Sequence, residues 1–191
     1  MLAPLLSPDL PAVPWITTWS DEHRYEVRPC RWAGGRPAVW QPHNPGSGTP
    51  LFKVRHMVRA RQAIARQLCG VCGRFVTEGD RWIVPIGAIV IVNGAEACAL
   101  QEPFVHTRCM AHALELCPAL MPAFDRTKQG PVPLTVDWFA ETFSATGAVV
   151  NQEFGTAVPA GNNVVTALAV CLRRHHFQRL FPHGIIRMMQ R

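Results

Sequence analysis

The sequence has no long apolar stretch. Its longest apolar run, at 83–92, is ten residues long and is interrupted by Pro85 and Gly87, whereas a membrane-spanning helix needs about 20 residues. Residues 1–8 contain two prolines and lack the basic start of a secretory signal. We therefore expect no membrane partner and a cytoplasmic location.

Common enzyme motifs are also missing. The chain contains no P-loop, no GxGxxG and no GxSxG pattern, so we expect no small-molecule substrate. Lysine is scarce, since Lys and Arg together number 19 and only two of these are Lys. This arginine bias is typical of a GC-rich genome, such as that of an actinobacterium or one of its phages. The apolar content of 48% excludes global disorder.

Four candidate metal ligands occur as two pairs. Cys69 and Cys72 form a CxxC turn that contains and precedes glycine, which lets the backbone fold back so that both sulfurs converge. His106 and Cys109 stand three apart at the start of an expected helix at 107–116, so they share one helix face. Three thiolates and one imidazole form a set that tetrahedral Zn²⁺ favours. We therefore predict one structural zinc ion.

His112 is an alternative fourth ligand, because it also lies three residues from Cys109. His106 is preferred because both ligands of this pair should lie in the first helical turn. The remaining cysteines lack paired spacing and are interpreted as core or half-exposed thiols; they are Cys30, Cys98, Cys117 and Cys171. Disulfides are not expected, because the count of 7 is odd and no secretory signal is present.

The sequence has a CxxC turn, then room for a hairpin, and then a helix that carries the last two ligands. This order resembles that of the treble-clef zinc fingers. The resemblance covers about residues 66–121. It implies a zinc ion with four protein ligands and no open position for water. Treble clefs include the HNH nucleases, which place a catalytic histidine on the first hairpin strand. Residues 73–105 contain no histidine, so we expect no nuclease activity and assign no catalytic residue.

The predicted fold class is α+β, with a central treble-clef zinc module flanked by short antiparallel strands and a C-terminal helix. The expected parts are a flexible arm at 1–14, a strand-rich part at 15–50 with an exposed linker at 41–50, a basic helix and zinc module at 51–130, and a C-terminal α+β part at 131–191 packed with the rest as one domain. Two or three short strands are expected within 15–40.

Several elements are predicted within these parts. They are a helix from about Leu51 or Val54 to Leu68, a hairpin joining 75–77 to 81–84, a buried strand at 88–92 with a turn at Asn93 and Gly94, a strand pair across 147–158 with a turn near Glu153 or Gly155, and a helix from Asn162 or Asn163 to about Arg179. The helix at 107–116 is expected to end at Pro118 and Pro122. Arg61 falls within the apolar stripe of the first helix and is expected to reach past the edge of the core, the alternative being an acidic partner.

Arginines on the predicted helices indicate a partner. The candidate phosphate-contacting residues are Arg55, Arg59 and Arg66, on one exposed face of the first helix, and Arg173 and Arg174. With a net charge of +6, they favour a nucleic-acid-binding or regulatory protein. The alternative is a protein–protein interaction adaptor or inhibitor, possibly encoded by a phage and acting on a host protein, with purely structural zinc. Six tryptophans and the missing catalytic set support that alternative.

Overall fold

The computed structural model describes residues 10–84, 86–116, 130–182 and 185–188, and this part of the chain is mixed α+β. A seven-stranded sheet has the order β11-β6-β7-β10-β3-β2, and β9 pairs with β10. Its strands are β2 (Glu26–Pro29), β3 (Pro37–Trp40), β6 (Ile86–Val92), β7 (Ala95–Leu100), β9 (Phe139–Thr146), β10 (Asn163–Arg173) and β11 (Ile185–Met188). The pairs β3–β10 and β6–β11 are parallel, and the others are antiparallel.

Two small ribbons and several helices complete the described part. The ribbons are β1 (Thr17–Trp19) with β4 (Pro50–Arg55), and β5 (Trp82–Ile83) with β8 (Val132–Pro133). The α-helices are α1 (Met57–Arg66), α2 (Thr107–Leu116), α4 (Gly147–Phe154) and α5 (Arg174–Leu180), and the single 3₁₀ turns are η1 (Ser20–Glu22), η2 (Arg31–Ala33) and η3 (Glu78–Asp80). The three strands expected within 15–40 and the helix at 107–116 are confirmed. No described helix has the length and apolarity that crossing a bilayer requires.

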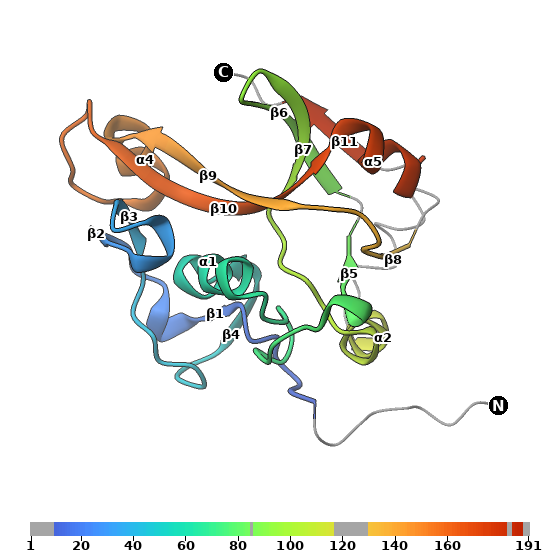
Figure 1. Cartoon of the computed structure of the whole chain (residues 1–191). Helices are drawn as coiled ribbons and strands as arrows, with labels where there is room; N and C mark the ends of the chain where they lie inside the picture. The colour runs from blue at the N-terminus through green and yellow to red at the C-terminus, as the bar shows by residue number, and fades with distance from the viewer. Residues whose placement is uncertain (1–9, 85, 117–129, 183–184, 189–191) are drawn as a thin grey trace.

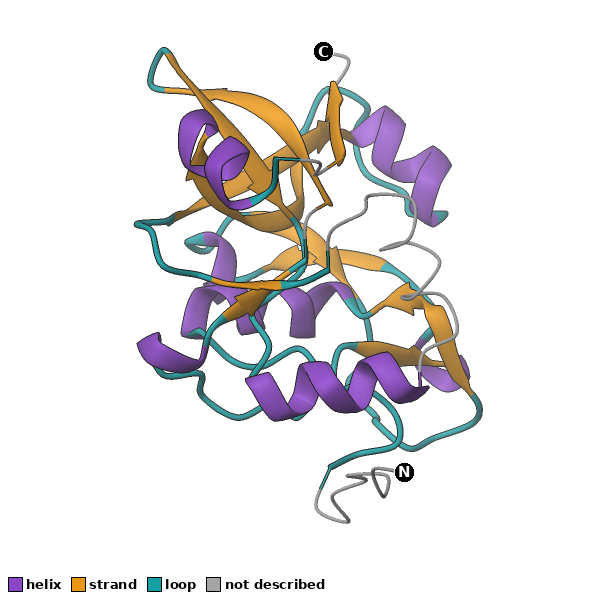
Figure 2. Cartoon of the chain, turned by 90° about the vertical axis from the view of Figure 1, so that its right-hand side faces the viewer, coloured by secondary structure: helices purple, strands orange, loops and turns teal. Residues whose placement is uncertain are grey.

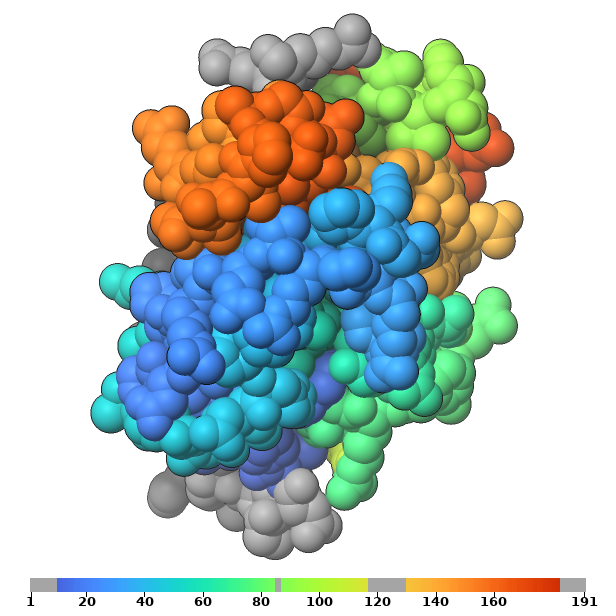
Figure 3. All heavy atoms as spheres, turned by 90° about the vertical axis from the view of Figure 1, so that its left-hand side faces the viewer, coloured from blue at the N-terminus to red at the C-terminus, as the bar shows by residue number. Residues whose placement is uncertain are grey.

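Strand β10 forms the centre of the fold. It pairs with β9 from Asn163 to Cys171, with β3 at Val165 and with β7 along its last residues, and it is buried on both faces (Figures 1 and 2). Helix α1 packs against it and lies between the large sheet and the β1–β4 ribbon (Figure 1). The N-terminal segment covers one side of the molecule, next to α4 and its neighbouring strands (Figure 3). The surroundings of α1 are thus built from both halves of the sequence.

The main hydrophobic core joins the candidate metal ligands to the large sheet. Cys69 and Cys109 are fully buried in the same cluster as Leu100 of β7, Leu172 of β10 and Phe177 of α5. Burying one leucine or phenylalanine side chain stabilises a fold by about 1.5–3 kcal/mol. The metal-ligand region and the sheet therefore share one core.

The predicted helix at 51–68 is wrong in its first part, because Pro50–Arg55 forms β4 and the helix begins only at Met57. This segment pairs with β1, so its backbone groups form hydrogen bonds across the ribbon. The helical spacing of its apolar residues gave no sign of that partner. His56 caps α1, since its Nδ1 accepts the backbone N–H of Arg59 at 3.2 Å. Within the predicted exposed linker at 41–50, Gln41 is fully buried and Pro50 begins β4.

Two predictions in the last third are also wrong. The segment expected as a strand pair across 147–158 contains helix α4, which ends at Gly155 in the left-handed conformation, with φ of 64°. The segment expected as a helix from Asn162 or Asn163 is strand β10, followed only then by the short helix α5. An apolar run buried on both sides carries no clear period, so pairing with three neighbouring strands decides its conformation.

The predicted hairpin joining 75–77 to 81–84 is wrong as well. Phe75 bridges back to Leu68, and β5 pairs with β8 instead. The turn at Asn93 and Gly94 is confirmed, with φ of 50° and 76°, and it joins β6 to β7. The predicted end of the helix after residue 116 at Pro118 and Pro122 lies outside the described residues.

The first residue of α4 provides a test of this corrected fold. A Cβ on Gly147 would collide with the carbonyl oxygen of Pro159 and a methyl group of Val158. Gly147→Ala should therefore lower the free energy of unfolding by about 1–3 kcal/mol, more than the gain in helix propensity offsets. Gly161→Ala is the matched control, because its Cβ would meet no atom within 4 Å. Equal melting temperatures for the two variants would contradict the packing of α4.

Candidate metal centre

The CxxC segment forms a tight turn closed by backbone hydrogen bonds. The amide of Cys69 donates to the Arg74 carbonyl at 2.7 Å, and the amide of Gly73 donates to the Cys69 carbonyl at 2.9 Å. Gly73 has φ of 71°, and a Cβ there would stand 3.0 Å from the Trp15 ring. The amide of Val71 donates to the Cys69 sulfur at 3.4 Å, so the turn also supports a charged thiolate.

The other two ligands lie at the start of α2. His106 directly precedes the helix, and Cys109 lies in its first turn, as the spacing predicted. The Asp80 carboxylate of η3 accepts the backbone N–H of Thr107 at 2.8 Å and so caps this helix. The turn and the helix are joined directly, because the amide of Gly70 donates to the Phe104 carbonyl at 2.9 Å.

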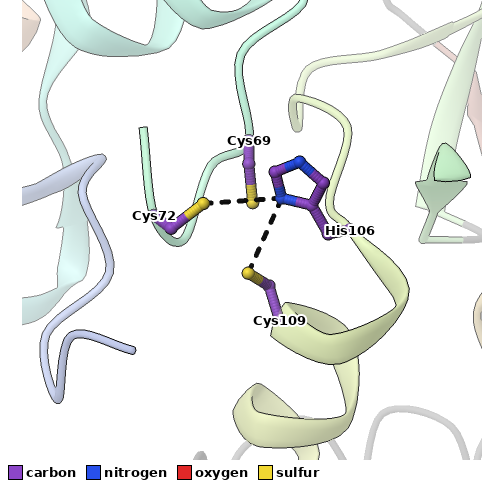
Figure 4. A group of neighbouring side chains, drawn as sticks. All are labelled: Cys69, Cys72, His106 and Cys109. Atoms are coloured by element: carbon purple, nitrogen blue, oxygen red, sulfur yellow. Dashed lines mark hydrogen bonds between the residues drawn. The ribbon is translucent and has the colours of Figure 1, made fainter. Parts of the chain in front are cut away.

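The four ligand atoms converge on one point. The sulfurs of Cys69, Cys72 and Cys109 and a ring nitrogen of His106 all lie within 4.8 Å of one another (Figure 4). His106 Nδ1 is 3.4 Å from the Cys72 sulfur and 3.7 Å from the Cys109 sulfur. Tetrahedral bond lengths for zinc place its sulfur and nitrogen ligands about 3.6 Å apart. The donor set and its spacing therefore fit a metal ion such as Zn²⁺.

The orientation of His106 also fits this site. Its Nε2 lies 3.0 Å from the carbonyl oxygen of Phe75. A carbonyl only accepts hydrogen bonds, so this contact places the proton on Nε2 and leaves the Nδ1 lone pair directed at the three sulfurs. A hydrogen bond from the distant ring nitrogen is the usual support of a histidine metal ligand.

Two of the three thiols, those of Cys69 and Cys109, are in an environment that disfavours their charged form. Burial raises the pKa of Cys69, and burial together with the neighbouring Cys69 and Cys72 raises that of Cys109. Three thiolates so close together would need a cation to compensate their charge, and a divalent metal is the cation that thiolates bind directly. The site is thus chemically suited to a metal.

The alternative ligand His112 lies elsewhere. Its side chain is buried, and its Nε2 is 3.3 Å from the carbonyl oxygen of Pro11. Pro11 belongs to the part of the predicted arm that the structure describes, and neighbouring Leu10 packs against the main core. The structure gathers His106, and not His112, with the three cysteines.

The shared exposed face predicted for Arg55, Arg59 and Arg66 does not exist. Arg59 is fully buried, and its guanidinium donates to both carboxylate oxygens of Glu22, at 2.6 and 2.7 Å. Arg55 lies on β4 and forms an ion pair with Glu102 at 3.2 Å. Only Arg66 of these three stays exposed without a carboxylate partner among the described residues. Arg55 leaves this face because the helix starts after it, and Arg59 is buried because Glu22 of η1 packs on its guanidinium.

The buried pair of Glu22 and Arg59 belongs to a polar network. Burial alone would raise the pKa of Glu22, but hydrogen bonds from Arg59 and from the amides of Trp19 and Asn44 lower it to about 2. Burial and the Arg59 charge lower the pKa of the adjacent His56 to about 4. The network is therefore held with Glu22 charged and His56 neutral at pH 7.

Arg61 does not reach past the core edge as expected. It is 1% exposed, and its guanidinium donates to the carbonyl oxygens of Val39 and Thr166. Burial lowers its pKa, and the nearby Cys30 opposes that shift. Arg61 thus joins α1 to β3 and β10 through hydrogen bonds to backbone carbonyls. No acidic side chain forms an ion pair with it among the described residues, so the alternative expectation is wrong as well.

The second predicted arginine pair lies at the junction of β10 and α5. Arg174 forms an ion pair with Glu96 at 2.5 Å, while Arg173 is exposed. A role of these two residues with nucleic acid stays a prediction. Asp80 and Trp15 also support the metal centre, but the sequence gives no local signal for them, because each lies far along the chain from the element that it contacts.

The described cysteines are all free thiols. Cys117, interpreted as another core or half-exposed thiol, lies outside the described residues. Comparison of this chain with protein-family models, with curated proteins and with solved structures found no match.

Proposed function

We propose that this chain is a non-enzymatic, cytoplasmic binding protein that is stabilised by one structural Zn²⁺ and that binds nucleic acid. The observation that supports it most directly is the convergence of Cys69, Cys72, His106 and Cys109 on one point. Four protein ligands fill a tetrahedral zinc shell, which leaves no position for a reacting water. The ion would hold the CxxC turn against α2, as in a treble-clef-like module, and supply folding energy instead of catalysis.

Unbalanced arginines support nucleic acid as the partner. Among the described residues, four arginines have a carboxylate within 4.0 Å: Arg28, Arg55, Arg59 and Arg174. Other arginines are exposed and have no such partner in the described part: Arg24, Arg31, Arg66, Arg74, Arg108, Arg173 and Arg179. Guanidinium groups that lack an internal anion are available to phosphates, and the net charge of +6 agrees with an anionic partner.

A salt titration tests the nucleic-acid partner. We expect the zinc-loaded protein to bind fluorescently labelled DNA, with anisotropy showing an affinity that falls steeply as KCl rises from 50 to 200 mM. Labelled single-stranded and duplex DNA of equal length are the two probes. Absence of binding to both probes at 50 mM salt would refute nucleic acid as the partner.

A groove favours the second candidate, a protein–protein interaction adaptor. It has a volume of about 570 Å³ and is bordered by β1, β4, the CxxC turn and α2. Its lining is mostly apolar and includes Pro11, Pro14, Phe52, Val71 and Leu116. Phe52 is 66% exposed and Leu116 is 47% exposed, which is unusual for large apolar side chains. If neither DNA probe binds, this groove becomes the expected binding site and a protein becomes the expected partner.

A further inference from the structure

One exposed cluster places two arginines on a single tryptophan ring. The Arg31 guanidinium carbon lies 4.2 Å from the centre of the Trp32 ring, and that of Arg66 lies 5.9 Å from the same ring. Arg31 and Trp32 belong to η2, whereas Arg66 ends α1. We call Arg31, Trp32 and Arg66 the Arg–Trp surface; the N-terminal segment that carries η2 is exposed on the face seen in Figure 3.

The local backbone fixes this cluster. The amide of Cys30 donates to the Arg36 carbonyl at 3.0 Å, and the left-handed residues Gly34 and Gly35 turn the chain between β2 and β3. Trp32 is half-buried and packs against a small cluster of buried residues that includes Ala38 and Val165. The buried residues that contact Trp32 thus hold its ring in place, and both guanidinium groups lie over this ring.

The charge of the cluster is uncompensated. The two guanidinium carbons lie no more than about 10 Å apart, the sum of their distances to the ring centre. Two cations at such a separation repel each other within one Debye length at 0.1 M salt. Neither has a carboxylate within 4.0 Å among the described residues. An external anion between them would remove this repulsion.

A second arginine–tryptophan stack provides a contrast. The Arg28 guanidinium lies 3.7 Å from the Trp40 ring centre, but it also forms an ion pair with Glu26 at 2.6 Å. That stack is neutralised within the protein and needs no ligand. The Arg–Trp surface differs from it by the second arginine and by the missing acid.

We propose that Arg31 and Arg66 together bind the phosphodiester backbone of a nucleic acid, and that Trp32 positions both guanidinium groups. This inference rests on the proposed function and names the surface that carries it. Guanidinium groups match phosphate oxygens with paired hydrogen bonds, and stacking on an indole keeps their donor edges directed outward. Single strands and duplexes both present this chemistry.

The test uses the full zinc-loaded chain and the two DNA probes. Arg31→Gln/Arg66→Gln should weaken binding by at least roughly tenfold at 50 mM salt and flatten the plot of log K against log salt by roughly 1.4 for single strands or 1.8 for duplex. Arg28→Gln, compared with Arg31→Gln alone, is the control, because it removes the same charge from an arginine that stacks on a tryptophan but has an acidic partner. The control should change affinity and slope much less.

Trp32 provides a separate readout. Trp32→Ala should weaken binding with unchanged charge, while Trp32→Phe, which keeps an aromatic ring, should restore most of the affinity at an equal melting temperature. If the wild type binds DNA but Arg31→Gln behaves like the control, the Arg–Trp surface is refuted and nucleic-acid binding stands. If the wild type binds neither probe, the proposed function itself fails. If Arg31→Gln/Arg66→Gln loses affinity for only one probe, that probe identifies single-stranded or duplex DNA as the ligand.

Discussion

Replacing Cys109 with alanine should abolish zinc binding and unfold the entire described fold. Native mass spectrometry should show one zinc ion in the wild type and none in Cys109→Ala. A closed site of three thiolates and one imidazole contributes on the order of 10 kcal/mol in small zinc modules, comparable to the total stability of a typical domain. Because Cys109 shares one core with β7, β10 and α5, the loss should extend beyond residues 66–121.

Amide hydrogen exchange would show which elements lose their structure when zinc is removed. After chelation, protection of the amides in β10 should fall together with that of α2, since both elements contribute to the same core. Retained protection of β10 would mean that the metal-ligand region unfolds independently. That outcome would fit a separate zinc module better than one cooperative domain.

Matched variants separate ligand loss from the loss of a buried thiol. Cys171→Ala removes an equally buried thiol outside the ligand group and should keep its zinc. His106→Ala should release zinc, whereas His112→Ala should retain it, because only His106 points at the sulfurs. Folded, metal-free wild-type protein would contradict the zinc assignment.

Replacing Glu22 with glutamine should cost about 3–5 kcal/mol at pH 7, because it leaves the fully buried Arg59 without its counter-ion. Urea unfolding measures this loss. Glu78→Gln is the control, since Glu78 is exposed and has no ion pair among the described residues. A cost below 1 kcal/mol for Glu22→Gln would show that water reaches the pair.

The pH dependence of this cost has a defined sign. The pKa of Glu22 is about 2 in the folded state against 4.5 when unperturbed, so its stabilisation is complete above pH 4.5 and is lost as pH falls toward 2. The difference between wild type and Glu22→Gln should therefore shrink over that range, while effects of acid on the zinc site cancel. His56, with its pKa lowered to about 4 from 6.5, adds a loss of wild-type stability between pH 6.5 and 4.

The metal ligands could be predicted because they depend on local spacing. Three residues separate the members of each pair, and a turn or a helix converts that spacing into proximity whatever the rest of the chain does. The choice of His106 over His112 followed from the position of the first helical turn. The support from Asp80 and Phe75 could not be predicted, since it depends on how η3 and the CxxC turn meet α2.

The arginine face failed for a related reason. Arg55 belongs to β4, which forms because β1 lies beside it, and Arg59 is buried because Glu22, which lies 37 residues away along the chain, pairs with it. Likewise, the run at 163–173 contains both helix-favouring and β-branched residues, and three strand partners decide in favour of β10. Gly155 was expected to turn a strand pair, but a glycine directly after 147–154 is also typical of a helix end.

The parallel pairing of β10 with β3 joins Val165 to Ala38. During synthesis, β3 must wait for the ribosome to add more than a hundred residues before its partner emerges, which takes several seconds or longer. Over that interval its apolar edge is open to strands of other chains. Yield of soluble protein should therefore depend on translation speed and on chaperones, even though the finished fold encloses this edge.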